Sequence, residues 1–397
     1  MSKADTKADT KVDTKGTVKV EGDRKSCIFY LPYPLEKTGN RARQLRPRKM
    51  LMAFREMGYR VFLIQGYSEK RKARIKLLKS LIDQGVKFDF MYGETSTEPI
   101  RLSDPKHLPV HPFMDFAFFR YLKEQGIPVG IFYCDIYWKF PVYKESVSGW
   151  RYYAAIHFYR SEMKKFSEVL TRLFIPDLRM CKYMECPEAE AIASALPPGA
   201  DPVTGPEKVQ RGRRSFNKHP LEIFYVGGIG AFYRLDELLK AIEPLEQVRL
   251  TICCRENEWE TEKEKLLPLM TDRVEVVHKN EDELAPYYEK ADIGSLMFEA
   301  DEYRGMARPV KAYEYLGHHL PVLATKGTAI GDFAEETGFG WSLPFESKAI
   351  RKKLEEILAE PKLLTEKRKL AKALAPENLW ISRAKQAAEE LTGKQIQ

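Results

Sequence analysis

The segment from Arg308 to Gly327, RPVKAYEYLGHHLPVLATKG, places a cation and an acid where they could act together. If the segment begins as a helix, Lys311, Glu314 and Tyr315 are about one turn apart, and Lys311 and Glu314 share a face. At the start of a helix, a lysine could hold a diphosphate and a glutamate could accept hydrogen bonds from ribose hydroxyls, which suits a nucleotide sugar. A surface ion pair would have the same spacing, so the pattern alone leaves both interpretations open.

A glycine-rich turn, YVGGIG from Tyr225 to Gly230, follows an apolar run and precedes a helical pattern. Glycines such as Gly227 and Gly228 let backbone amides approach a phosphate at a helix N-terminus, where the helix dipole favours negative charge. The turn lacks the full Gly-x-Gly-x-x-Gly spacing of dinucleotide-binding folds. A purely structural turn would look the same, so phosphate binding is one of two interpretations.

Short apolar runs that alternate with helical patterns must position these residues. Strands are predicted over residues 27–31, 60–65, 88–92, 128–133 and 169–175, with helices over 45–57, 76–84 and 113–125. A second series predicts strands over 222–226, 248–253, 274–278, 293–298 and 322–324 and a helix over 235–242. Because strands separated by helices form parallel sheets, we expect an α/β fold of two doubly wound, Rossmann-like domains with a cleft between them. Ligands of such sheets bind beyond the carboxyl ends of the strands.

Composition divides the chain of 397 residues further. Residues 1–26 repeat an Ala/Val-Asp-Thr-Lys unit with few large apolar side chains, which predicts a disordered tail. Residues 202–219 are rich in proline, glycine and basic residues, which is typical of a linker. We therefore expect domains over 27–201 and 220–377, followed by a C-terminal segment over 378–397.

Charge is distributed unevenly along the chain. Residues 27–199 contain 28 Lys and Arg against 18 Asp and Glu, whereas residues 220–397 contain 25 against 32. Basic runs over residues 41–49 and 70–79 lie near the aromatic stretches FMDFAFFRYL and GWRYYAAIHFY. Cations beside aromatic residues are typical of a surface that docks on an anionic membrane. The aromatic stretches could equally be core. No RNA-binding motif is present, so nucleic acid is not an expected partner.

Several classes of protein are excluded by what the sequence lacks. No apolar run approaches the roughly 20 residues of a membrane-spanning helix. The N-terminus has no apolar core or cleavage site of a secretory signal, so we expect a cytoplasmic protein that can associate peripherally with the inner face of the cell membrane. The six cysteines form no zinc-ligand pattern, and Cys181 and Cys186 are expected to be reduced thiols. No metal or cofactor is therefore expected.

From Pro309 to Thr325 the sequence resembles the donor-binding motif of GT-B nucleotide-sugar glycosyltransferases, relatives of glycogen synthase that build bacterial polysaccharides. YVGGIG resembles the first strand and turn of their donor domain, and residues 290–298 and 339–343 resemble the strands that flank the motif. The resemblance implies that Gly227, Gly228, Lys311, Glu314 and Tyr315 bind the donor. It also implies that the segment from Trp380 to Leu391 crosses back to the N-terminal domain.

The chain departs from the family pattern at two places. Many members have a first glutamate eight positions before the one that matches Glu314, where this chain has Met306. The usual arginine and lysine of the first turn are replaced by Gly228 and Tyr233, and we expect the adjacent Arg234 to supply the charge. These departures leave retention or inversion at the anomeric carbon open.

The resemblance assigns acceptor binding to the N-terminal domain. Asp135, in YCDIYW, comes directly after a predicted strand and could take the proton of an acceptor hydroxyl, although an aspartate there could also cap a helix. His111 and His157 are alternative bases. Gly39, Asn40 and Arg41 open the first helix and could bind a phosphate of donor or acceptor.

Together with the resemblance, these features imply a hexosyltransferase that moves a sugar from a nucleotide donor, such as a UDP-sugar, to a lipid-linked saccharide acceptor in surface polysaccharide synthesis. The missing first acid also permits an alternative. In that case the chain would be a catalytically silent GT-B protein that binds and stabilises a partner glycosyltransferase.

Overall fold

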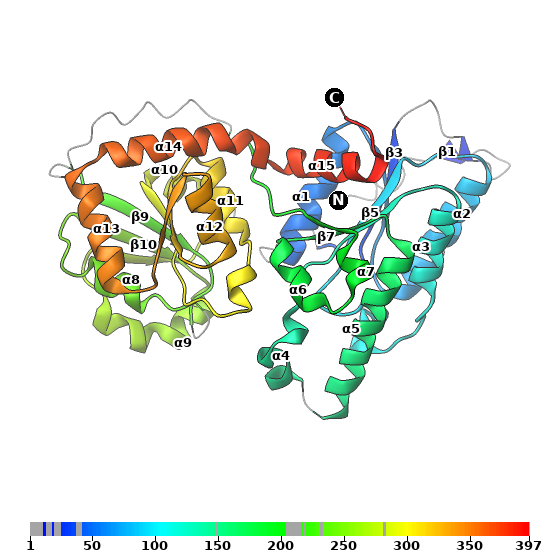
Figure 1. Cartoon of the computed structure of the whole chain (residues 1–397), viewed down its shortest axis with the longest axis horizontal. Coiled ribbons are helices and arrows are strands. Elements are labelled where there is room, and N and C mark those ends of the chain that lie inside the picture. Colours follow the sequence, from blue (N-terminus) through cyan, green and yellow to red (C-terminus); the bar gives the residue numbers. More distant parts are fainter. Residues whose placement is uncertain are drawn as a thin grey trace. The chain divides into compact units, whose positions relative to one another are not determined.

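The computed structural model describes residues 11–12, 18–19, 25–36, 42–147, 149–203, 216, 219–230, 233–280 and 283–396. They form two compact units (Figure 1). Unit 1 contains the described residues up to Pro197 together with those from Arg383 onward, and unit 2 runs from Pro198 to Ser382. Two short strands near the start of the chain, β1 (Lys11–Val12) and β2 (Val18–Lys19), pair antiparallel. Both strands fall in the segment over residues 1–26 that was predicted to be a disordered tail. The other residues of that segment up to residue 24 lie outside the described residues, as does most of the predicted linker over 202–219.

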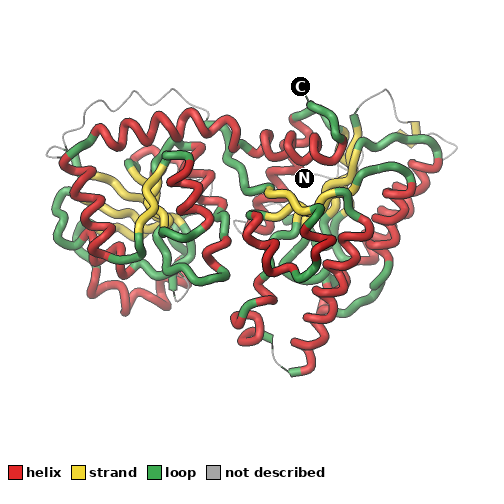
Figure 2. Tube along the Cα trace, in the orientation of Figure 1, coloured by secondary structure: helices red, strands yellow, loops and turns green. Residues whose placement is uncertain are grey.

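Unit 1 is a parallel six-stranded sheet with helices on both faces (Figure 2). Its strand order is β4-β3-β5-β6-β7-β8. The strands are β3 (Ser26–Tyr30), β4 (Arg60–Ile64), β5 (Phe90–Glu94), β6 (Val129–Phe132), β7 (Arg172–Ile175) and β8 (Ala193–Ala195). The helices are α1 (Ala42–Glu56), α2 (Ser68–Asp83), η1 (Ile100–Leu102), η2 (Pro105–His107), α3 (Met114–Glu124), η3 (Tyr137–Lys139), α4 (Pro141–Ser146), α5 (Trp150–Val169), η4 (Leu178–Met180), α6 (Cys181–Met184) and α7 (Pro187–Glu190).

Unit 2 contains a second parallel six-stranded sheet, in the order β11-β10-β9-β12-β13-β14. The strands are β9 (Leu221–Val226), β10 (Val248–Cys253), β11 (Val274–Val277), β12 (Ile293–Leu296), β13 (Val322–Thr325) and β14 (Gly340–Leu343). The helices are α8 (Asp236–Ile242), α9 (Glu256–Leu266), η5 (Leu267–Leu269), α10 (Ala285–Lys290), η7 (Arg304–Met306), α11 (Val310–Gly317), α12 (Ala329–Glu336), α13 (Ser347–Ala359), α14 (Lys362–Leu374) and η8 (Ala375–Asn378). The last helix, α15 (Trp380–Thr392), begins in unit 2 and belongs to unit 1 from Arg383 onward. Every residue of β9 is buried, as expected of a central strand covered on both faces.

The predicted α/β fold with two doubly wound sheets is confirmed, and the differences concern element boundaries. The helix expected over 76–84 begins at Ser68, and the strand expected over 169–175 begins at Arg172 because α5 continues to Val169. β8 was not predicted, since alanine and serine have little strand preference. The last part of α15 packs within unit 1, where Gln386 Nε2 donates to the Ala195 carbonyl over 2.9 Å.

A buried arginine holds several segments of unit 1 together. Arg71 on α2 is 1% exposed and donates from Nε and Nη2 to both carboxylate oxygens of Asp115 on α3, over 3.0 and 2.8 Å. Its Nη1 also donates to the carbonyls of Pro32 and Gly66. The sequence placed Arg71 in a basic run that was interpreted as part of a membrane-docking surface. The structure corrects this, because the side chain is a core cation with a full set of partners.

Removing one member of this pair should destabilise unit 1. Asp115→Ala leaves the Arg71 charge buried without its carboxylate, so we expect the free energy of unfolding to fall by about 3–5 kcal/mol. Lys76→Ala, at an exposed position of α2, the helix that carries Arg71, should change it by less than about 0.5 kcal/mol. Urea unfolding followed by circular dichroism measures both, and equal stability of the two variants would contradict this account.

Candidate functional site

The candidate donor site lies where the strand order of unit 2 reverses. β9 is the first strand of this sheet, with β10 on one side and β12 on the other. The connections that leave neighbouring strands here run to opposite faces, which opens a crevice at the carboxyl ends of the strands. The glycine-rich turn follows β9 directly, and α11 begins after the connection that leaves β12.

Tyr315 attaches α11 to the end of β9. Its hydroxyl donates to the Phe224 carbonyl over 3.0 Å and accepts the Val226 amide over 3.1 Å, and the residue is fully buried. The ring lies against β12 at Gly294, where a Cβ atom would come within 2.5 Å of it. The sequence placed Tyr315 among the donor-binding residues. The structure instead gives it a packing role, because both functions of its hydroxyl are used within the core.

Lys311 and Glu314 form an ion pair one turn earlier on α11. Lys311 Nζ donates to Glu314 Oε2 over 2.6 Å, and the two side chains are 26% and 17% exposed. The hydroxyl of Tyr288, on α10, donates to the same oxygen. Burial and the charge of Glu314 raise the pKa of Tyr288, so this hydroxyl remains a donor at neutral pH. The pair predicted from spacing is therefore present, partly exposed and held by a third residue that the sequence did not indicate.

The glycine turn already uses two of its backbone amides. Gly227 N donates to the Cys253 carbonyl over 3.1 Å, and Ile229 N donates to Glu258 Oε2 over 3.3 Å. The hydroxyl of Tyr225 donates to the Gly228 carbonyl over 2.5 Å, which fixes the direction of that peptide. Gly230 has a φ of +127°, a conformation that favours glycine. One amide of the turn, that of Ile229, thus already donates to a carboxylate, which shows that this backbone can bind an anionic group.

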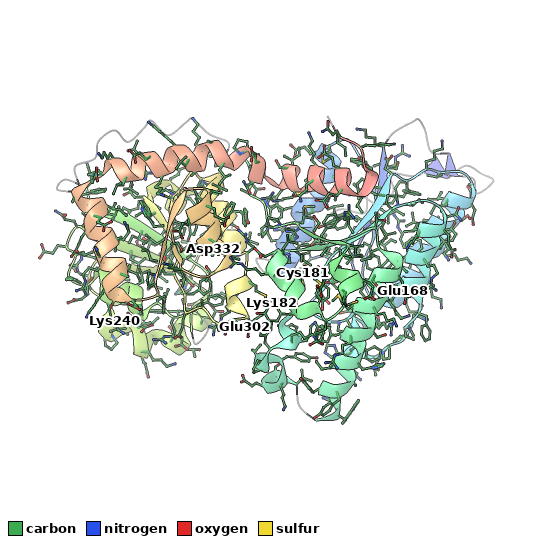
Figure 3. The ribbon with its side chains drawn as sticks, viewed as in Figure 1. Glu168, Cys181, Lys182, Lys240, Glu302 and Asp332 are labelled. Atoms are coloured by element: carbon green, nitrogen blue, oxygen red, sulfur yellow. The ribbon has the colours of Figure 1, made fainter. Side chains whose placement is uncertain are left out.

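Arg234 is held between two acids. Its guanidinium donates to both oxygens of Asp236, over 3.1 and 2.8 Å, and to Glu299 over 2.8 Å. These hydrogen bonds raise the pKa of Arg234. Asp236 also accepts from Lys240, which extends from α8 (Figure 3). The expected compensating cation is therefore present, but its charge is balanced by residues that follow β9 and β12.

A surface hollow of about 290 Å³ lies beside the turn. Gly230, Tyr233 and Arg234 line one part of it, and Glu262 and Lys265 of α9 line another.

At the position where many GT-B relatives have their first glutamate, Met306 is 6% exposed and apolar. No acid therefore occupies that position, and the nearby Glu299 is engaged by Arg234.

The candidate base lies in unit 1, after β6. Asp135 Oδ1 accepts the Tyr137 amide over 2.9 Å at the start of η3. The N-cap residue of η3 is Ile136, so Asp135 bonds a backbone amide of this helix from the position before the cap. Its carboxylate is half-buried. His111 Nε2 contacts Glu69 Oε1 over 2.5 Å, and His157 is exposed on α5. Asp135 lies three residues after the end of β6, a central strand, and its role as the base stays a prediction.

The remaining residues considered from the sequence are the predicted phosphate-binding residues and the cysteines. Gly39, Asn40 and Arg41 lie outside the described residues. All six cysteines are free, including Cys181 and Cys186. Within the ranges that the structure describes, no group of three or more His, Cys, Asp or Glu side chains could hold a metal ion. Across the same ranges, no helix has the length and apolar character needed to cross a bilayer.

Comparisons with known proteins agree with this geometry. Residues 220–360 match the family model for "Glycosyl transferases group 1". A search among curated proteins finds no match. The matched residues include the sheet of unit 2, the glycine turn and the Lys311–Glu314 pair, so this part of the chain is similar to group 1 glycosyltransferases.

Solved structures show the same architecture over nearly the whole chain. The UDP complex of Anabaena Alr3699/HepE is 14% identical, with 93% of this chain and 100% of that chain covered and a TM-score of 0.61. Its UDP-glucose complex gives 13% identity, the same coverage and a TM-score of 0.60. WaaG, a glycosyltransferase involved in lipopolysaccharide biosynthesis, is 15% identical over 92% of this chain and 100% of that chain, with a TM-score of 0.55. The chain therefore has the GT-B fold, which confirms the resemblance noted in the sequence.

Substitutions of Lys311 and Glu314 on α11 are expected to weaken nucleotide binding. On the predicted donor role of the pair, Glu314→Ala would remove an acceptor for ribose hydroxyls and Lys311→Ala would remove a cation, and each charge-assisted hydrogen bond contributes roughly 1.5–3 kcal/mol. Each variant should therefore bind UDP at least about tenfold more weakly by calorimetry. Lys348→Ala, at an exposed position of α13, serves as the control and should bind UDP normally. Wild-type affinity in both α11 variants would remove the donor site from this helix.

Proposed function

We propose that this chain is a hexosyltransferase that transfers a sugar from a UDP-sugar bound on unit 2 to a saccharide acceptor bound on unit 1. The observation that carries the proposal is the partly exposed Lys311–Glu314 pair at the strand-order reversal of a group 1 glycosyltransferase domain. UDP and UDP-glucose are the ligands named for the similar HepE structures. They suggest the same donor here.

The residues suggest a division of chemical work. Glu314 accepts hydrogen bonds from the ribose, while Lys311 and amides of the glycine turn other than those of Gly227 and Ile229 hold the diphosphate. Asp135 takes the proton of the acceptor hydroxyl as that oxygen bonds to the anomeric carbon and the bond to the diphosphate breaks. The departing UDP carries the bonding electrons as negative charge on its terminal phosphate. The cation and amides stabilise that charge.

Turnover separates this proposal from the alternative of a silent partner-binding protein, which the apolar Met306 favours. Purified protein with a panel of UDP-hexoses should release UDP, slowly by hydrolysis and faster with a saccharide acceptor. Asp135→Asn should lower the transfer rate by about 10²–10⁴ and leave UDP affinity unchanged, because the residue lies in the other unit.

Two controls test whether the loss of rate comes from the base itself and whether a metal takes part in turnover. Asn retains the capping acceptor for the Tyr137 amide, so a loss of rate cannot be ascribed to η3 unfolding. EDTA should leave turnover unchanged if no metal takes part. Binding of UDP without any release from UDP-hexoses would favour the silent protein, and a near wild-type rate in Asp135→Asn would move the base elsewhere.

We further propose that the acceptor is lipid-linked, that the product is a surface polysaccharide, and that unit 1 docks on the inner face of the cell membrane. Trp150 and Tyr153, one turn apart on α5, are 76% and 70% exposed. Lys72, Lys76 and Lys79 line a surface hollow of about 500 Å³ on α2. Large aromatic side chains and lysines at a surface suit the headgroup region of an anionic bilayer.

The structure changes which basic and aromatic residues can take part. Arg71 is buried with Asp115, and Phe116, Phe118 and Phe119 of the FMDFAFFRYL stretch are core residues. Phe113, at the start of that stretch, is 71% exposed. The aromatic run therefore mainly forms the core, as one of the two sequence interpretations held.

Vesicle binding tests this docking. Each lysine near an anionic surface contributes about 1 kcal/mol, so changing Lys72, Lys76 and Lys79 together to Gln should release the protein from anionic vesicles. Salt at 1 M should do the same, because the Debye length falls to about 3 Å. A control with Lys348, Lys352 and Lys369 of unit 2 changed to Gln removes the same charge and should still pellet. Equal pelleting with neutral vesicles, or none at low salt, would disprove membrane docking.

A further inference from the structure

Glu314 contacts two donors through one of its two carboxylate oxygens. Lys311 Nζ and the Tyr288 hydroxyl both donate to Oε2. Oε1 accepts no hydrogen bond from any residue that the structure describes, and the Glu314 side chain is 17% exposed. The carboxylate is therefore fixed at one oxygen and open at the other.

Tyr288 is itself rigidly held. It is 4% exposed, and its ring packs edge-on against Phe224 with centroids 5.3 Å apart. Tyr315 contacts it at 5.8 Å, and the ring of His318 stacks on it at 4.2 Å with an angle of 8° between the planes. A ring enclosed on these sides cannot move its hydroxyl oxygen away from Glu314 without disturbing β9 and α11. The position of this hydrogen-bond donor is thus set by the core.

We propose that Tyr288 is a positioning residue for nucleoside recognition, which holds Glu314 by Oε2 so that Oε1 faces the donor and accepts a ribose hydroxyl. This inference depends on the proposed donor site. Without Tyr288, Lys311 is the remaining partner, and a lysine on a flexible stem that also attracts the diphosphate fixes the carboxylate poorly. Tyr288 therefore lets Lys311 turn toward phosphate while Glu314 keeps its orientation.

A positioning role and a purely structural role of Tyr288 predict different nucleotide preferences. A carboxylate held in one orientation favours a ribose over a deoxyribose, because a hydroxyl-bonding site left without its partner is penalised. A tyrosine that only supports the fold would affect every nucleotide equally. The affinity ratio between UDP and its 2′-deoxy and 3′-deoxy analogues therefore reports positioning.

Calorimetry of Tyr288→Phe with these three nucleotides tests the proposal. Wild-type protein should bind UDP about tenfold more tightly than at least one deoxy analogue. In Tyr288→Phe that ratio should fall below about threefold, through weaker binding of UDP with the affinity for the deoxy analogue unchanged. Tyr287→Phe is the matched control, since Tyr287 lies next to it on α10 and stacks on Phe224 with centroids 5.7 Å apart. It should keep the wild-type ratio.

A double-mutant cycle with Glu314→Gln supplies the second measurement. Adding Tyr288→Phe to Glu314→Gln should change the ratio no further, because the residue acts through the carboxylate. An unchanged ratio in Tyr288→Phe, or equal weakening of all three nucleotides, would overturn the positioning role. If wild-type protein does not bind UDP at all, the proposed function fails with it. If UDP binds and Glu314→Gln abolishes discrimination while Tyr288→Phe does not, this inference alone fails.

Discussion

The candidate donor site depends on the two hydrogen bonds of the Tyr315 hydroxyl to the end of β9. They tie the middle of α11 to Phe224 and Val226, in the last part of the strand that precedes the glycine turn. The close approach is possible because residue 294 of β12 has no side chain. With Tyr315 fixed, the preceding turn of α11 has one available direction. Lys311 and Glu314 therefore stand at the carboxyl edge of the sheet with little conformational freedom left to lose on binding.

Most charges around this edge are compensated within unit 2. Arg234 is shared by Asp236 and Glu299, Lys311 is paired with Glu314, and Glu258 accepts an amide of the glycine turn. The sequence of this part of the chain is acidic overall, with 32 Asp and Glu against 25 Lys and Arg over residues 220–397. For the proposed diphosphate, recognition on this unit would therefore depend on the geometry of these groups more than on net charge.

Unit 1 uses its charges differently. Arg71 and Asp115 are buried and join α2 and α3 to the loops after β3 and β4, so an ion pair that is costly to desolvate fixes segments at the carboxyl edge. The aromatic residues divide in a similar way. Trp138 and Tyr159 stack in the interior with centroids 4.9 Å apart, whereas Trp150 and Tyr153 remain at the surface of α5. The buried stack of Trp138 and Tyr159 thus packs the same helix, α5, that carries the exposed Trp150 and Tyr153.

The sequence by itself determined the fold class and the face shared by Lys311 and Glu314. Both follow from local periodicity: buried parallel strands are continuous apolar runs, and residues three apart on a helix are neighbours. Tertiary structure decided what periodicity cannot encode. Tyr315 and Glu314 are adjacent in sequence, yet one is a core anchor and the other a partly exposed acid, because they point to different sides of α11.

The same reason explains the other differences. Arg71 stands among lysines in the sequence, and its burial depends on Asp115, 44 residues away. Tyr288 has no signal in its own segment, because its role depends on an acid 26 residues later that α11 brings to it. Partners that meet across elements leave no local pattern. The sequence therefore indicated which residues can do chemistry, and the packing of helices on the sheet decided which side chains hold them in place.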